Sequence, residues 1–297
     1  MVAPGILLID KPDGLTSHDV VARVRRAFGT RKVGHAGTLD PMATGLLVLG
    51  VEGATRLLTY IVGADKTYLA TIRLGQSTTT DDAEGEVTAS ADDESMDALT
   101  AARIAAGISA LTGDIAQVPS SVSAIKVDGK RAYDRVRAGE DIELKARAVT
   151  VSRFDVLAER PGAGIVDLDV VVDCTSGTYI RALARDLGAD LGVGGHLTAL
   201  RRTRVGPFAV EDAVRLDDLG GAAVLTPGHA ASQILPRLEV TAQEARDLRH
   251  GKRLTEQAAR LERTQAAAID PDGDLVGIVE RRGKDLKSAM NMPEETR

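Results

Sequence analysis

Residues 34–45 of the chain read GHAGTLDPMATG, and the apolar run LLVLG follows at residues 46–50. Glycines bracket an Asp-Pro step, in which Pro41 fixes its own φ angle and restricts Asp40 to extended conformations. The glycines allow tight turns or the close approach of another backbone. We therefore predict a carboxylate on a rigid loop at the edge of a sheet, suited to presenting one acid to a substrate. The alternative is a glycine-rich turn in which Asp40 caps a local backbone group, since Asp is common in turns.

The length of 297 residues fits one large domain and one small domain. No window approaches the roughly 18 unbroken apolar residues that a membrane span requires, and the opening MVAPG lacks the basic region of a signal peptide. The one cysteine, Cys174, rules out an internal disulfide and a cysteine-based zinc site. The sequence contains neither a nucleotide-cradling loop nor histidines at metal-ligand spacing. We expect a cytoplasmic protein with no membrane partner.

The net charge of −6 argues weakly against a nucleic-acid partner, because phosphate binding needs clustered Lys and Arg. The charges are segregated, however. Residues 81–97 carry eight acids and no base, which predicts a solvated acidic surface. Basic residues gather at 23–26, 31–32, 126–137 and 201–204, and these clusters could form a stripe on another face. An RNA partner is therefore possible from composition, and not established by it.

Local patterns predict a mixture of strands and helices. Strands are expected at 5–10, 66–75, 149–158 and 164–175, with a turn at 159–162. Helices are expected at 18–28 behind Thr16 or Ser17 as N-cap, and at 54–62, 96–111 and 179–187. Residues 118–145 are basic with little apolar periodicity, which indicates a long functional loop.

A composition shift at residues 213–236 suggests a linker to a small C-terminal module. The module is predicted to contain a helix at 241–249 and a hairpin that pairs 266–269 with 275–280 across DPDG. Residues 284–297 are expected to be a frayed tail.

Five short blocks occur in a fixed order between residues 5 and 205. They are KP at 11–12 with GLTS at 14–17, GHAGTLDPMATG at 34–45, KTY at 66–68 with LGQ at 74–76, SGTYIR at 176–181, and LRRT at 200–203. Together they resemble the motifs of TruB-type tRNA pseudouridine synthases. The resemblance implies an α+β pseudouridine synthase fold, with a mixed, mainly antiparallel central sheet flanked by helices and a small C-terminal β-barrel-like, PUA-like domain. The implied division is a catalytic domain at 1–232, with a basic RNA-clamping insertion at 118–145, and an RNA-binding domain at 233–290.

The resemblance also implies roles for individual residues. Asp40 would be the catalytic acid and Arg181 its ion-pair partner, because a guanidinium is always charged and forks onto a carboxylate. Tyr68 would lie against the target base, with Tyr179 and Leu200 lining the uridine pocket. His35 would contact the RNA and help to hold the flipped-out conformation, since a base inside a folded T loop cannot be reached.

The implied reaction converts uridine to pseudouridine in the T loop of tRNA, position 55 in the family's terms, without a cofactor or metal. Whether the acid attacks the base or sugar, or acts through a glycal, is left open. Lys126, Lys130 and Arg131 would contact the RNA backbone. The C-terminal module would grip the acceptor end of tRNA. No obligate protein partner is implied, and a monomer is expected.

The sequence also bears on three other functions. A synthase for large ribosomal RNA would carry Arg directly before Leu-Asp, where this chain has Thr38. An RNA chaperone that assists tRNA folding would not need Asp40. An aspartate-nucleophile hydrolase or phosphatase would need a second nearby Asp, and none occurs at 41–44.

Overall fold

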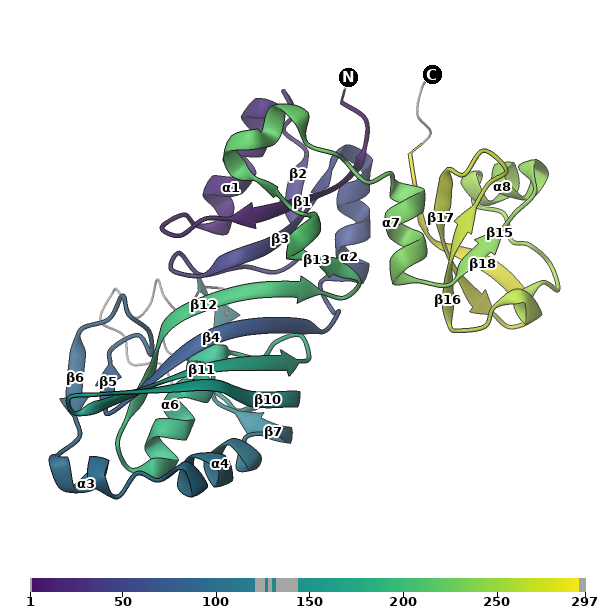
Figure 1. Cartoon of the computed structure of the whole chain (residues 1–297). Helices are drawn as coiled ribbons and strands as arrows, with labels where there is room; N and C mark the ends of the chain where they lie inside the picture. Colours follow the sequence, from purple (N-terminus) through teal and green to yellow (C-terminus); the bar gives the residue numbers. More distant parts are fainter. Residues whose placement is uncertain (1, 121–125, 128–129, 132–143, 294–297) are drawn as a thin grey trace.

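The computed structural model describes residues 2–120, 126–127, 130–131 and 144–293. Two sheets with flanking helices form the molecule (Figure 1). The larger has ten strands in the order β14-β1-β3-β12-β4-β11-β10-β7, with β2 beside β3 and β13 beside β12. The pairs β1–β14 and β3–β12 are parallel and the other pairs antiparallel. The predicted α+β class with a mixed, mainly antiparallel central sheet is confirmed.

The ten strands of the large sheet have these bounds: β1 (Gly5–Lys11), β2 (Val33–His35), β3 (Thr44–Val51), β4 (Lys66–Leu74), β7 (Gly113–Gln117), β10 (Arg147–Gly162), β11 (Ile165–Cys174), β12 (Gly195–Val205), β13 (Phe208–Ala209) and β14 (Val214–Arg215). Two short hairpins stand apart from it, β5 (Gln76–Thr78) with β6 (Val87–Ser90), and β8 (Lys126–Val127) with β9 (Lys130–Arg131).

Helices cover one face of the large sheet. They are α1 (Ser17–Ala27), the short α3 (Asp93–Asp97), α4 (Ala101–Ala110) and α6 (Ile180–Leu191). Figure 1 shows α4 and α6 together beside the β4–β11–β10 part of the sheet. Helix α1 begins in a capping box between Thr16 and Asp19, and it buries Val20, Val21 and Val24 in the core under the sheet. The predicted helix at 18–28 is confirmed, with Thr16 as N-cap.

The smaller sheet has the order β15-β16-β17-β18, with β15 (Arg237–Glu239), β16 (Gln265–Ile269), β17 (Leu275–Arg282) and β18 (Asp285–Asn291). The helix α8 (Ala242–Arg249) packs on it, which confirms the predicted helix and hairpin. Helix α7 (Pro227–Ile234) lies between the two sheets in Figure 1. One apolar cluster joins residues of β1 and β3, of α7 and of the small sheet. The predicted domain boundary at 232–233 falls within α7 and stays a prediction.

The predicted frayed tail is wrong for residues 285–291. These residues form β18, which pairs with β17 along its length. Leu286 is fully buried in the core of the small sheet and also bridges to Leu254. Burial of this apolar side chain, together with two sets of backbone hydrogen bonds, orders a segment that charge and position alone suggested would fray.

Three other predicted boundaries are wrong. Thr100 is extended and caps α4 through its side chain, so it breaks the expected 96–111 helix into α3 and α4. Helix α6 runs past Gly188 to Leu191, and Gly192 ends it at φ +77°. The expected turn at 159–162 belongs to β10, which continues through Pro161 because β7 pairs with β10 only at 147–151 and leaves that edge open.

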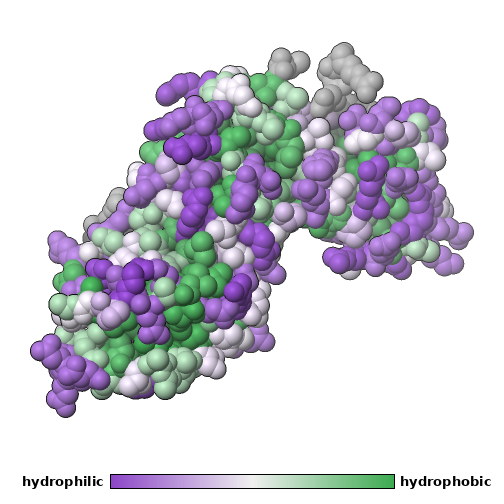
Figure 2. All heavy atoms as spheres, in the orientation of Figure 1, coloured by the Kyte–Doolittle hydropathy of each residue, from purple (hydrophilic) through white to green (hydrophobic). Residues whose placement is uncertain are grey.

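Exposed apolar side chains remain on the large sheet. Figure 2 shows hydrophobic surface over the β4–β11–β10 part and a mainly hydrophilic surface over the C-terminal part. Leu69 on β4 and Leu157 on β10 are 41% and 57% exposed, and they border a groove of about 480 Å³. No helix in the described ranges is both long and apolar enough to span a bilayer.

Candidate active site

Asp40 lies in the loop 36–43 that joins β2 to β3. Strand β3 runs between β1 and β12, so the loop stands at the end of an interior strand and not at a lateral edge of the sheet. The Asp40 side chain is 35% exposed. The acid is therefore accessible, while Leu39 before it and Ala43 after it are buried.

The carbonyl groups of this loop are anchored from several segments. Ser17 Oγ donates to Leu39 O at 3.0 Å and accepts from Leu39 N at 2.8 Å. The Pro41 carbonyl accepts from Gly14 N and from Lys11 Nζ, each at 3.0 Å. The Asp40 carbonyl accepts from Ala43 N at 3.1 Å. Since buried backbone groups cost free energy when unpaired, these contacts fix the loop in one conformation.

Arg202 anchors the same loop from β12. Its Nη2 donates to Gly37 O at 3.1 Å, its Nη1 to Thr38 O at 3.3 Å and its Nε to Leu46 O at 2.8 Å. The side chain is almost fully buried. Gly45 makes the approach possible, because a Cβ there would lie 2.2 Å from Arg202 O.

Arg181 contacts two carboxylates. Its Nη2 lies 3.0 Å from Asp40 Oδ2 and its Nη1 lies 3.1 Å from Asp82 Oδ2, so the ion pair predicted between Arg181 and Asp40 is present. Nη1 also donates to Thr80 O at 3.0 Å. Arg181 and Asp82 are buried, with 5% and 2% of their side chains exposed. The guanidinium is thus held rigidly behind the accessible acid.

The acidic segment 81–97 is the predicted solvated surface at six of its eight acids, and Asp81 and Asp82 are the exceptions. Asp82 is buried because it pairs with Arg181, and Asp81 pairs with Arg185 at 3.2 Å one turn further along α6. Thr78 Oγ donates to Asp82 O at 2.8 Å and shapes the turn. A buried carboxylate needs a charged partner, and a run of acids in sequence gives no indication of where that partner lies.

Tyr68 and Leu200 face the site from neighbouring strands. Tyr68 is 7% exposed on β4, and burial raises the pKa of its phenol, while the nearby Arg202 guanidinium acts in the opposite direction. Leu200 is buried on β12, and its carbonyl accepts a long hydrogen bond of 3.4 Å from Thr44 Oγ1 at the start of β3. The structure thereby connects Leu200 to the strand that follows Asp40.

Tyr179 is the N-cap of α6, two residues before Arg181, and its own side chain makes no capping bond. Gln117 holds its backbone instead. Gln117 Nε2 donates to Tyr179 O at 3.0 Å, and Tyr179 N donates to Gln117 Oε1 at 2.8 Å. Burial raises the pKa of the Tyr179 phenol. Gln117 is 1% exposed at the end of β7, so the start of the basic insertion is joined to this side of the site.

His35 is half-buried at the end of β2, where it pairs with Leu49 of β3. His35 therefore lies directly before the loop that carries Asp40, and Thr44 lies directly after it. Lys126, Lys130 and Arg131 lie on the β8–β9 hairpin, where Lys126 pairs with Arg131. The side chains of these three lie outside the described residues.

The basic run 201–204 does not form a free RNA-binding stripe. Arg201 makes a two-pronged ion pair with Asp10, at 2.8 and 2.9 Å. Arg204 lies 3.6 Å from Asp173 Oδ1, and Arg202 is buried. The possible stripe is limited here to Arg201 and Arg204, which are 39% and 43% exposed and ion-paired, because alternate residues of a strand face opposite sides of the sheet.

Two lysines near the loop are also buried. Lys11 Nζ donates to Leu15 O at 2.6 Å and Pro12 O at 2.9 Å as well as to Pro41 O. Burial lowers the pKa of Lys11 to about 8, against the pull of nearby Asp13 and Asp40. Lys66 Nζ donates to the carbonyls of Val62 and Ala64, which follow α2 (Leu58–Ile61). Burial lowers the pKa of Lys66 to about 8 as well.

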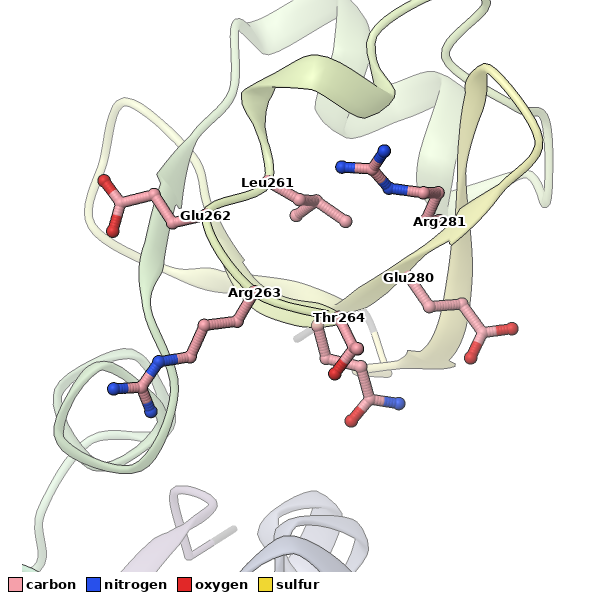
Figure 3. A pocket seen from close by; sticks show the side chains of 7 residues that line it. Leu261, Glu262, Arg263, Thr264, Glu280 and Arg281 are labelled. Atoms are coloured by element: carbon pink, nitrogen blue, oxygen red, sulfur yellow. The ribbon is translucent and has the colours of Figure 1, made fainter.

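Other parts of the molecule offer less chemistry. A pocket of about 720 Å³ opens on the C-terminal module (Figure 3), where Glu262, Arg263 and Glu280 point away from its middle. Its Arg281 donates to Ala258 O at 3.1 Å. Within the described ranges, no group of three or more His, Cys, Asp or Glu could hold a metal ion. The arrangement around Asp40 is therefore the strongest candidate site: an accessible acid on an anchored loop, backed by a buried cation and flanked by aromatic residues.

Comparisons with known proteins identify the family. Residues 25–180 match the model "TruB family pseudouridylate synthase (N terminal domain)". Residues 181–240 match "tRNA pseudouridylate synthase B C-terminal domain", and residues 235–293 match "tRNA Pseudouridine synthase II, C terminal".

Curated relatives cover nearly the whole chain. The tRNA pseudouridine synthase B of Leifsonia xyli subsp. xyli is 61% identical, covering 99% of this chain and 98% of the relative. That of Arthrobacter sp. is 57% identical, covering 94% and 93%. Among solved structures, an H/ACA RNP bound to a substrate RNA containing 2'-deoxyuridine includes a chain with a TM-score of 0.72 at 23% identity, covering 98% of this chain and 86% of that one. This likeness shows the pseudouridine synthase fold. The chain belongs to the TruB family of pseudouridylate synthases.

Proposed function

We propose that the chain isomerises a uridine in the T loop of tRNA, position 55 in the family's terms, to pseudouridine. The observation that carries the proposal is that Asp40 is accessible to solvent while the groups behind it are buried. This acid is 35% exposed, whereas its partner Arg181 and the second acid on that guanidinium, Asp82, are buried. Family membership and the tRNA pseudouridine synthase B relatives support a tRNA substrate.

The reaction breaks the N1–C1′ bond and forms a C5–C1′ bond, while a proton leaves C5 and N1 gains one. It is an isomerisation, so no further reactant is needed for its balance. The uridine must first leave the stack to expose C1′ and the far edge of the base. Asp40 is the group that acts on the sugar or the base, by nucleophilic attack or by removal of a proton.

The surrounding residues then have separate tasks. Arg181 makes a charge-assisted contact with the Asp40 carboxylate and so fixes the orientation of that carboxylate. Tyr68, Tyr179 and Leu200 line the uridine pocket, and His35 contacts the RNA at the other end of the loop. Because the loop is anchored before the RNA arrives, the acid does not need to be ordered during the reaction.

The decisive experiment measures tritium release from T-loop RNA that carries 5-³H-uridine. The wild-type protein should release tritium, and Asp40→Asn should release none while it binds the same RNA. Asp167→Asn is the matched control, because Asp167 also makes an ion pair with an arginine, Arg73, elsewhere on the sheet. The proposal fails if folded wild-type protein releases no tritium from intact RNA. Full function in Asp40→Asn would favour an RNA chaperone instead.

We also propose that the basic insertion at 118–145 contacts the RNA backbone through Lys126, Lys130 and Arg131, and that the C-terminal module at 233–290 contacts the acceptor end. The supporting observation for the insertion is its charge in the sequence. Charge reversal at Lys126 and Lys130 should weaken binding and flatten its salt dependence, because fewer counterions are released. An unchanged salt slope would remove this segment from the interface.

A further inference from the structure

Arg202 is the largest fully buried side chain in the described part of the chain, and the proposed reaction gives it no role. No carboxylate lies within ion-pair distance of it among the residues that the structure describes. Its guanidinium donates to three backbone carbonyls instead. Burying an arginine without an acid partner costs free energy, and these three hydrogen bonds offset part of that cost.

The three acceptors lie on both arms of the loop that carries Asp40. Gly37 and Thr38 precede the acid, and Leu46 follows it on β3. The planar fork therefore spans the base of the loop and sets the separation of its two arms. A guanidinium presents its donors in fixed directions, which a flexible ammonium group cannot match.

The position of Arg202 in the sheet connects this loop to the uridine pocket. On one side Arg202 pairs with Gly45 of β3, and on the other it pairs with Tyr68 of β4. The Arg202 guanidinium also lies close enough to the Tyr68 phenol to oppose the rise of its pKa. Leu200 lies two residues earlier on the same strand. Arg202 thus contacts the acid's loop, pairs with the strand of Tyr68 and shares a strand with Leu200.

We propose that Arg202 is a positioning residue, which holds the Asp40 loop at a fixed distance from Tyr68 and Leu200 and so acts on turnover without touching the RNA. The inference rests on the proposed function for its assay. It predicts that loss of the fork lowers the rate of the chemical step and leaves RNA affinity nearly unchanged.

The test compares lysine substitutions along one strand. Arg202→Lys keeps the charge and loses the fork, and the single-turnover rate should fall by about 10²-fold, the cost of a displacement near 1 Å at a reacting group. The Kd for T-loop RNA should stay near that of the wild type. Arg201→Lys and Arg204→Lys are matched controls on the opposite face, and each should change the rate by less than about fivefold, the worth of an exposed ion pair.

A second variant guards against loss of folding in Arg202→Lys. An ester in place of the Gly37–Thr38 amide weakens the Gly37 carbonyl as an acceptor. No hydrogen bond from Thr38 N–H is described, so little else is lost. Its single-turnover rate should fall several-fold at an unchanged Kd.

The outcomes separate the two proposals. An inactive wild-type protein defeats the proposed function. An active wild-type protein with wild-type rates in folded Arg202→Lys and in the ester variant overturns the role of Arg202. If Arg202→Lys does not fold, the ester variant decides. A weakened Kd at an unchanged rate would also overturn the inference, because it would show Arg202 acting on binding.

Discussion

The hydroxyl of Ser17 provides a quantitative test of the anchored loop. Ser17 Oγ bonds both the carbonyl and the amide of Leu39, at 3.0 and 2.8 Å, and the side chain is 3% exposed. Ser17→Ala leaves a buried donor and a buried acceptor unpaired, each costing about 1–3 kcal/mol. Alanine recovers about 0.5 kcal/mol of helix propensity at this first position of α1. The free energy of unfolding should therefore fall by about 2–5 kcal/mol.

Turnover should fall with it, because Leu39 immediately precedes Asp40. The assay is urea denaturation together with single-turnover tritium release at a temperature where the variant stays folded. Thr16→Ala is the matched control. It removes the neighbouring hydroxyl, which caps the same helix, at a cost of about 1 kcal/mol, and it should leave turnover unchanged. Equal unfolding midpoints and equal rates for Ser17→Ala and the wild type would refute the reasoning.

Three further predictions concern the same framework. Gly45→Ala should lower the urea midpoint of unfolding far more than Gly29→Ala. Both glycines have positive φ, but of the two only Gly45 would bring a Cβ against backbone, at 2.2 Å. Similar midpoints for the two variants would contradict the close approach of Arg202 to Gly45. Gln117→Ala should raise the KM for T-loop RNA by about 3–10-fold, the net worth of one or two hydrogen bonds, and an unchanged KM would separate Tyr179 from the base pocket. The pKa of Lys11 is lowered to about 8 from 10.5, so between these pH values the unfolded chain binds more protons and stability rises with pH. The stability of the wild type relative to Lys11→Met, from urea denaturation, should therefore increase from pH 8 to 10.5; a decrease would reverse the sign of the shift.

Local patterns in the sequence predicted the elements that are determined locally. The capping box at Thr16, the alternation along β4 and the DPDG hairpin each depend on neighbouring residues, and all three are present. The family motifs also brought Asp40 and Arg181 together correctly. In each case the deciding interactions either lie within a few residues or are recorded in a motif.

The framework behind Asp40 could not be predicted in this way. Asp82 lies 99 positions from Arg181, Gln117 lies 62 positions from Tyr179, and Arg202 lies 164 positions from Thr38. Each contact joins a side chain to a distant segment, often to a backbone carbonyl that has no residue signature. Charge patterns were only a partial guide, because a run such as RRTR does not show which side chains a strand turns inward.

The apolar cluster shared by the two sheets has a mechanical consequence. Ile6 and Leu46 of the large sheet, Ala230 of α7 and Ile278 of the small sheet are all fully buried within it. Moving the two sheets apart would expose this surface to water, so the separation between the sheets is fixed. An RNA that made both proposed contacts, one near Asp40 and one on the C-terminal module, would have to match this fixed separation.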